Sequence, residues 1–198
     1  MYLKPKQTRS KKRIEIILNT AEEIILSEGI KSITIANISE LSGLKRTSTY
    51  KFFPTPEDIK LALINRYVNN CAIYFKNESS NIQTEHLSVV VLRCVEILFD
   101  FFNANKSSHE LILKSSITLS IDSELLSKLS TPIQNYIESN IALPGMHNKD
   151  GIYRVLTQII LAIFSLNAKE SGNLNETGKI EAHRAGTAYM QNWVEQNS

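Results

Sequence analysis

The sequence predicts an all-α protein, with a three-helix N-terminal domain, a larger helical domain behind it, and about nine helices in all. Glycine and proline, which most often end helices, are sparse: no Gly lies between Gly43 and Gly145, and no Pro between Pro56 and Pro132. Apolar residues recur at helical spacing, and no sustained alternation typical of strands occurs. A hydrophobic content of 42% in 198 residues is enough for a packed core.

The first helix is expected over residues 12–27, where an apolar face repeats every three or four residues. Its members are Ile14, Ile17, Leu18, Ala21, Ile24 and Ile25. Gly29 is well placed to cap its end. Thr34 is a candidate N-cap for a second, short helix over residues 35–41. The residues of that helix expected to face inward are Ile35, Ile38 and Leu41.

A third helix is expected over residues 45–52, after a turn at residues 42–44. Gly43 supplies the positive φ that such a turn needs, and two short helices joined in this way form a helix-turn-helix. The second of them lies in the major groove, where cationic and hydroxyl side chains bind phosphates and base edges. The candidate DNA-contacting residues are Thr34, Lys45, Arg46, Thr47, Ser48, Tyr50 and Lys51.

The rest of the chain shows further helical patterns, beginning with a strong start signal at residues 55–58. There, Thr55 is a candidate N-cap, Pro56 takes the first helical position and two acids follow. The long helices are expected over residues 56–76, 85–105, 151–169 and 179–196, and shorter ones near 109–116, 122–129 and 131–141. The sequence therefore divides into a domain of residues 1–55 and a domain of residues 56–198.

Charge differs between the two ends of the chain. Residues 1–60 hold 11 Lys and Arg against 7 Asp and Glu, a balance of +4, while residues 61–198 hold 11 against 13, a balance of −2. A basic N-terminal part favours contact with a polyanion, although a solvated basic tail would give the same balance.

Residues of unlike type fall at fixed spacings along the N-terminal part. They are Ile17, Leu18, Ala21, Glu28, Gly29, Thr34, Ile38, Gly43, Leu44, Tyr50 and Phe53. Through them, the segment from Arg13 to Ile59 resembles the DNA-binding domain of the TetR family of bacterial transcriptional regulators. The resemblance implies a cytoplasmic homodimer that binds a partly palindromic double-stranded DNA operator, most often as a repressor released by a small-molecule effector.

The segment also departs from the family pattern. Lys45 stands where Ser or Thr is usual, Thr47 where Gly is frequent, and Thr49 where an aliphatic residue is frequent. Pro56 replaces a Lys that contacts phosphate in the family, and Lys60, one turn further on, is the candidate substitute. These departures leave open a ligand-binding or interaction protein with a vestigial helix-turn-helix. A second alternative is an activator of the same type, since the sequence does not separate activation from repression.

The helical remainder is expected to bind the effector and to form the dimer. Candidate pocket residues are Tyr67, Cys94, Phe99, Phe102, Tyr136 and Phe164, which would equally suit an ordinary aromatic core. The helices over 151–169 and 179–196 carry enough apolar and small residues for a four-helix bundle between two subunits, although they could instead pack within one subunit. The expected interface residues are Ile159, Ile163, Ala182, Gly186, Tyr189 and Trp193.

Other classes of protein find little support. No phosphate-binding glycine loop, nucleophile elbow or His/Cys/Asp cluster is present, so the expectation is a non-enzyme without cofactor or metal. Cys71 and Cys94 lie in apolar helical patterns and are expected to be reduced core residues of a cytosolic protein. The longest apolar run, residues 159–164, is too short to cross a bilayer, so no membrane partner is expected.

Overall fold

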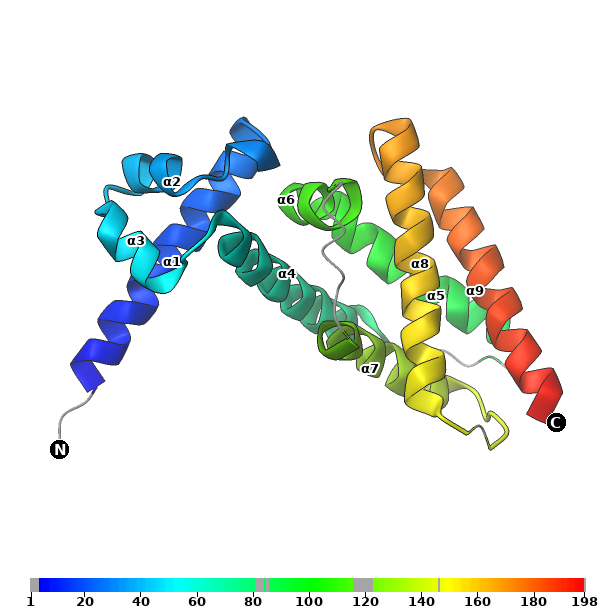
Figure 1. Ribbon diagram of the computed structural model, residues 1–198. Helices are drawn as coiled ribbons and strands as arrows, with labels where there is room; N and C mark the ends of the chain where they lie inside the picture. Colours follow the sequence, from blue (N-terminus) through cyan, green and yellow to red (C-terminus); the bar gives the residue numbers. More distant parts are fainter. Residues whose placement is uncertain (1–3, 81–83, 85, 116–122, 146, 198) are drawn as a thin grey trace. The chain divides into compact units, whose positions relative to one another are not determined.

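A computed structural model describes residues 4–80, 84, 86–115, 123–145 and 147–197, and over these residues the chain is helical with no strand (Figure 1). The helices are α1 (Lys4–Ser27), η1 (Ile30–Ser32), α2 (Ile35–Ser42), α3 (Arg46–Phe52), α4 (Pro56–Glu78), α5 (Leu87–Ala104), α6 (Lys106–Ser108), η2 (His109–Lys114), α7 (Ser123–Asn140), α8 (Lys149–Ser171) and α9 (Glu176–Asn197). Residues 85, 116 and 122, at the edges of predicted helices, lie outside the described residues.

The chain forms two compact units, residues 1–66 and 67–198, and the division falls within α4. The boundary predicted at residue 55 coincides with the start of that helix. Thr55 and Asp58 cap the helix start, where the sequence predicts Thr55 as the N-cap. The Asp58 N–H donates to Thr55 Oγ1 at 3.2 Å, and the Thr55 N–H donates back to Asp58 Oδ2 at 2.8 Å.

In the first unit, α1 buries the apolar face that its sequence predicts. Ile17, Ala21 and Ile24 are fully buried. The helix begins at Lys4, earlier than predicted, because Pro5 is tolerated in a first turn and nothing after it breaks the helix. Leu41 of α2 was expected to face inward but is 60% exposed. At 3.6 residues per turn it falls outside the arc that the buried Ile35, Ile38 and Ser39 define.

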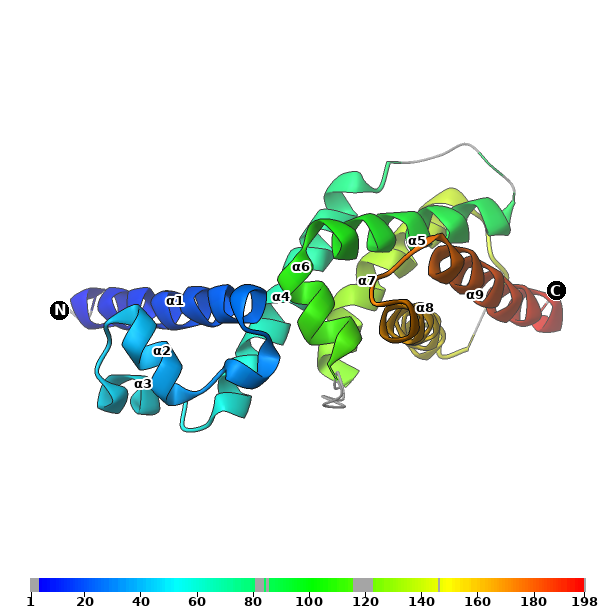
Figure 2. The ribbon, with the colours of Figure 1, turned by 90° about the horizontal axis from the view of Figure 1, so that it is seen from above.

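In the second unit, α8 packs against α7 and α9, and α5 packs against α9 (Figure 2). An apolar stripe along α5 is buried. The fully buried side chains contributed by these helices include Val91, Cys94, Leu98, Ile133, Leu156, Ile160 and Phe164. The second unit therefore has a helical core of its own.

A single helix, α7, replaces the two short helices predicted over residues 122–129 and 131–141, and Pro132 lies inside it. Its buried stripe of Leu125, Leu129 and Ile133 continues past the proline. The Thr131 hydroxyl donates to the carbonyl oxygen of Ser127 at 2.8 Å, just ahead of the proline.

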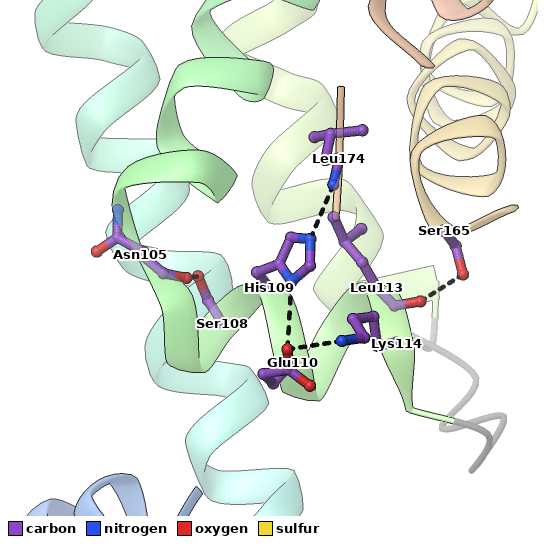
Figure 3. A network of polar contacts seen from close by, with 8 residues as sticks. All are labelled: Asn105, Ser108, His109, Glu110, Leu113, Lys114, Ser165 and Leu174. Atoms are coloured by element: carbon purple, nitrogen blue, oxygen red, sulfur yellow. Dashed lines mark hydrogen bonds and ion pairs between the residues drawn. The ribbon is translucent and has the colours of Figure 1, made fainter. Parts of the chain in front are cut away.

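The six residues of η2 form a π-helix, which polar contacts attach to the neighbouring segments (Figure 3). His109 Nε2 accepts the N–H of Leu174 at 3.2 Å, from the loop between α8 and α9. The Ser165 hydroxyl of α8 donates to the Leu113 carbonyl at 2.7 Å. These two bonds join η2 to α8 and to the loop that follows it.

By length and composition, α8 is the one helix among the described residues that could cross a membrane. The uninterrupted apolar run at residues 159–164 is much shorter than this helix, so the sequence alone did not predict the possibility. In the most apolar stretch of α8, 50% is buried within the protein. Leu156, Ile160 and Phe164 of this helix belong to the core. Packing inside a folded unit accounts for much of its apolar character.

Candidate nucleic-acid interface

The helix-turn-helix is formed by α2, the turn after Ser42, and α3. Thr34 Oγ1 accepts the N–H of Asn37 at 3.1 Å and so caps α2. Gly43 ends α2 in the left-handed conformation, with φ of 69°. A Cβ built on Gly43 would have nothing within 4 Å, so the glycine is required by the backbone conformation and not by lack of space. The cap and the turn are those that the sequence predicts.

A buried pair of hydroxyls holds α3 against α2. Thr49 is fully buried, and its Oγ1 lies 3.3 Å from Ser39 Oγ, so one hydroxyl donates to the other. This contact accounts for a threonine at a position where the family pattern has an aliphatic residue. Phe53, just after α3, is 8% exposed and belongs to the buried apolar residues of the first unit.

The opposite face of α3 is exposed and cationic. Tyr50 is 52% exposed, and residues 45–52 contain no Asp or Glu. Ser48 is half-buried. The exposed residues of this segment are Lys45, Arg46, Thr47, Tyr50 and Lys51. The structure thus brings the predicted α3 residues together on an accessible surface whose charge suits a phosphate backbone.

Lys45 occupies the N-cap position of α3 but makes no side-chain capping bond. Its carbonyl oxygen accepts the N–H groups of Ser48 at 2.8 Å and Thr49 at 3.2 Å, so the first turn forms without a hydroxyl cap. The ammonium group therefore remains on the exposed side of the helix start.

Lys60, the predicted substitute for a phosphate-contacting lysine, does not lie on this surface. It is 7% exposed, and its Nζ lies 3.4 Å from Glu57 Oε1. On α4, Lys60 falls inside the arc between the buried Ile59 and Ile64, so its stem packs along the core. The structure therefore does not group Lys60 with the exposed residues of α3, and its contact with DNA stays a prediction.

Arg66, the last α4 residue in the first unit, is bonded to α1. Its guanidinium donates to Asn19 Oδ1 and to Glu15 Oε2, both at 2.8 Å, and lies 3.8 Å from Glu22 Oε2. A forked contact of this kind restrains both the position and the rotation of the helix. The sequence analysis did not identify this residue, because its partners are about 50 positions away in the chain.

The residues predicted to line an effector pocket are mostly core. Phe99 is half-buried. Those that are buried are Tyr67, Cys94, Phe102, Tyr136 and Phe164. The ring of Phe164 packs edge-on against Phe99 at 6.2 Å and Phe102 at 6.5 Å between centroids. Tyr136 also lies at a groove of about 970 Å³ between α4 and α7.

The residues predicted for the dimer interface divide into two groups. Ala182 and Gly186 are buried inside the subunit, and a Cβ on Gly186 would lie 3.2 Å from Leu156 Cδ1 and 3.3 Å from Val91 Cγ1. These two small residues therefore permit close packing of α9 on α5 and α8 and cannot face a partner. The four half-buried residues are Ile159, Ile163, Tyr189 and Trp193.

Neither cysteine forms a disulfide, and both are buried. Burial raises the pKa of the Cys71 and Cys94 thiols above their usual range. Within the described part of the chain, no three His, Cys, Asp or Glu side chains are grouped so that they could hold a metal ion.

No protein-family model and no curated protein matches the chain. Solved structures do. A TetR-family transcriptional regulator from Streptomyces coelicolor superposes with a TM-score of 0.68 over 92% of this chain and 98% of its own, at 14% sequence identity. SmeT, the repressor of the Stenotrophomonas maltophilia multidrug efflux pump SmeDEF, gives 0.59 over 88% of each chain, at 14% identity. The TetR-family repressor AlkX from Dietzia gives 0.54 over 90% of this chain and 98% of its own, at 13% identity. The helical arrangement described above is therefore the fold of TetR-family transcriptional regulators.

Proposed function

We propose that the protein is a sequence-specific, DNA-binding transcriptional regulator of the TetR type and not an enzyme. The observation that carries this proposal is the exposed, cationic face of α3, presented by a helix-turn-helix whose cap at Thr34 and turn at Gly43 are both formed. A helix so placed enters the major groove while the helix before it crosses the phosphate backbone.

The α3 side chains differ in what they can bind. Arg46 can donate two hydrogen bonds to a guanine edge, while Thr47 and Ser48 suit either bases or phosphates. Lys45, Lys51 and the Tyr50 hydroxyl suit phosphate oxygens. The Thr34 oxygen accepts a bond within its own helix cap, which leaves its hydroxyl hydrogen to donate to a phosphate.

A homodimer is part of the proposal, because one short helix reads only a few base pairs and two subunits double the contacts on a partly palindromic operator. Apolar residues of α8 and α9 outside the subunit core support a bundle between subunits. They are the exposed Val155, Leu166 and Ile180 and the half-buried Ile159, Ile163, Tyr189 and Trp193.

Repression released by a small-molecule effector is the mode of action we propose, with the protein acting in the cytoplasm. Among the structurally similar proteins, SmeT and AlkX are repressors. In this chain, α4 belongs to both compact units, so a ligand that shifts its C-terminal half would also act on the half that Arg66 joins to α1.

The test is a selection of genomic DNA fragments on the purified protein, followed by fluorescence anisotropy at ~150 mM salt with the enriched fragment and a scrambled copy. Sequence-specific reading predicts an affinity at least ~10³ tighter for the enriched fragment. A selection that enriches no fragment, with equally weak binding to all DNA, would exclude the function.

A further inference from the structure

A groove of about 970 Å³ lies between α4 and α7 in the second unit. Its walls are two helical stripes with intervals of three and four residues, so each helix contributes one face along its length. Ala72, Ile73 and Lys76 lie on the α4 wall, and Lys128 and Pro132 lie on the α7 wall. The volume is in the range of sites that bury a small organic molecule.

The groove combines an apolar surface with positive charge. Ile73 is 60% exposed, and Pro132 and Ala72 extend the apolar lining. Lys76 and Lys128 place an ammonium group on each wall, and the described residues that line the groove include no Asp or Glu. These two cationic side chains favour an anion over a cation as the ligand.

Tyr136 lies beneath the α7 wall. The residue is 5% exposed, and its buried hydroxyl has no hydrogen-bond partner among the described residues. Because this hydroxyl has no exposed surface, the anionic group is assigned to the two lysines and not to Tyr136.

We propose that the α4–α7 groove binds the effector, and that the effector is an organic monoanion with an apolar body. Lys76 and Lys128 bind the anionic group, and Ile73 and Pro132 contact the apolar body. This inference rests on the proposed function. It places the ligand away from the rings of Phe99, Phe102 and Phe164, which pack against one another.

The position of the groove gives the ligand an effect on α4. Lys76 and Ile73 lie on the C-terminal half of this helix, and Arg66, further back on the same helix, is bonded to α1. An anion bridging Lys76 and Lys128 draws α4 and α7 together and changes the position of α4. The consequence is a change in DNA affinity.

Three probes of equal chain length test the charge and the apolar body separately: decanoate, decan-1-ol and decyltrimethylammonium, each below its micelle concentration. Isothermal titration calorimetry on the full chain without DNA is expected to show saturable binding of decanoate, weaker binding of decanol and none of the cation. Equal affinity for all three probes, or no binding of decanoate, would overturn the proposal.

The variant Lys76→Gln/Lys128→Gln is expected to bind decanoate about tenfold more weakly, with binding of decanol unchanged. Ile73→Ser is expected to weaken both. Lys169→Gln removes an exposed charge from α8, outside the groove lining, and is the matched control. Circular dichroism confirms folding of each variant, and an equal loss of decanoate binding in Lys169→Gln would contradict the assignment.

Addition of decanoate to the protein bound to its enriched DNA then separates the two proposals. Release of DNA by decanoate from wild type, but not from the double variant, is the expected result. If no DNA fragment is enriched but decanoate still binds in the predicted order, the proposed function fails while the site stands. If DNA binds specifically but decanoate does not bind, the site fails alone.

Discussion

At the scale of single residues, the site depends on a few buried polar contacts beneath an exposed face. Thr49 and Ser39 satisfy one another inside the first unit, which allows a hydroxyl residue to occupy an apolar position. Arg46 and Lys51, by contrast, are exposed and suited to contact DNA. The buried pair determines how α3 sits on α2, and the exposed pair determines what α3 can bind.

The buried pair predicts a non-additive effect on stability. Thr49→Val keeps the shape but leaves the Ser39 hydroxyl buried without its partner, which should lower the free energy of unfolding by about 1–2 kcal/mol. Adding Ser39→Ala should recover most of that loss, since neither polar group then remains. Urea unfolding of the two single variants and the double variant measures the coupling, and a fully additive double variant would contradict the hydroxyl pair.

The exposed pair predicts two kinds of loss in DNA binding. Arg46→Ala should cost about 1–3 kcal/mol on the specific operator and much less on random DNA, because it removes a base contact. Lys51→Ala should weaken binding to all DNA about equally and reduce the salt dependence, because it removes a phosphate contact. Anisotropy titrations at several salt concentrations measure both, with Lys106→Ala in the second unit as control. Equal losses on specific and random DNA for Arg46→Ala would exclude base reading.

At the scale of elements, short segments take their conformation from polar contacts with neighbours. The π-helix η2 is joined through His109 to the α8–α9 loop (Figure 3). His109 Nε2 accepts a backbone N–H, so its hydrogen is on Nδ1, which lies 3.8 Å from Glu110 Oε1. Burial lowers the pKa of His109, although the nearby carboxylate partly offsets this effect.

The lowered pKa predicts how stability depends on pH. The unfolded chain takes up the His109 proton near pH ~6.5, and the folded protein takes it up only at lower pH. The contribution of neutral His109 is therefore complete above pH ~6.5 and is lost as the pH falls below that value. Urea unfolding between about pH 7.5 and about pH 5.5 should show a smaller loss of stability for His109→Asn than for wild type.

The control for this pH dependence is His147→Asn, because His147 is exposed. It should leave the slope of unfolding free energy against pH unchanged. A wild-type slope equal to that of His109→Asn would mean that His109 does not hold its proton differently in the folded and unfolded states.

At the scale of the whole molecule, the proposed regulator acts as a dimer, and the outer surfaces of α8 and α9 are the proposed interface. Ala182 and Gly186 pack within the subunit, which brings α9 close to α5 and α8. The exposed and half-buried aliphatic residues of α8 are then left outside the core. An apolar surface of this kind favours association between subunits.

The interface predicts a monomeric variant. Ile163→Arg introduces a charge into the proposed interface and should weaken dimerisation about 100-fold or more, since an unpaired buried charge costs several kcal/mol. Sedimentation equilibrium at micromolar concentration should show two chains for wild type and one for the variant, with specific DNA affinity greatly reduced. Leu26→Arg, at a residue of α1 that is 50% exposed, is the matched control and should remain a dimer.

Much of the local structure follows from the order of residues in the sequence. The all-α class, the apolar face of α1, the cap at Thr34 and the left-handed turn at Gly43 were predicted because they depend on residue spacing and on backbone preferences within a few positions. The exposed face of α3 was predicted for the same reason, because a short helix with one apolar side leaves its polar side to solvent.

The folded structure alone shows which residues are covered by others far away in the chain. It buried Lys60 among the apolar residues of α4, exposed Leu41, placed Gly186 inside the subunit and continued α7 through Pro132. It also filled the expected aromatic pocket with its own side chains and left a cationic groove between α4 and α7. Burial is a property of three-dimensional neighbours, and helical periodicity gives the direction of a side chain around its axis but not what packs against it.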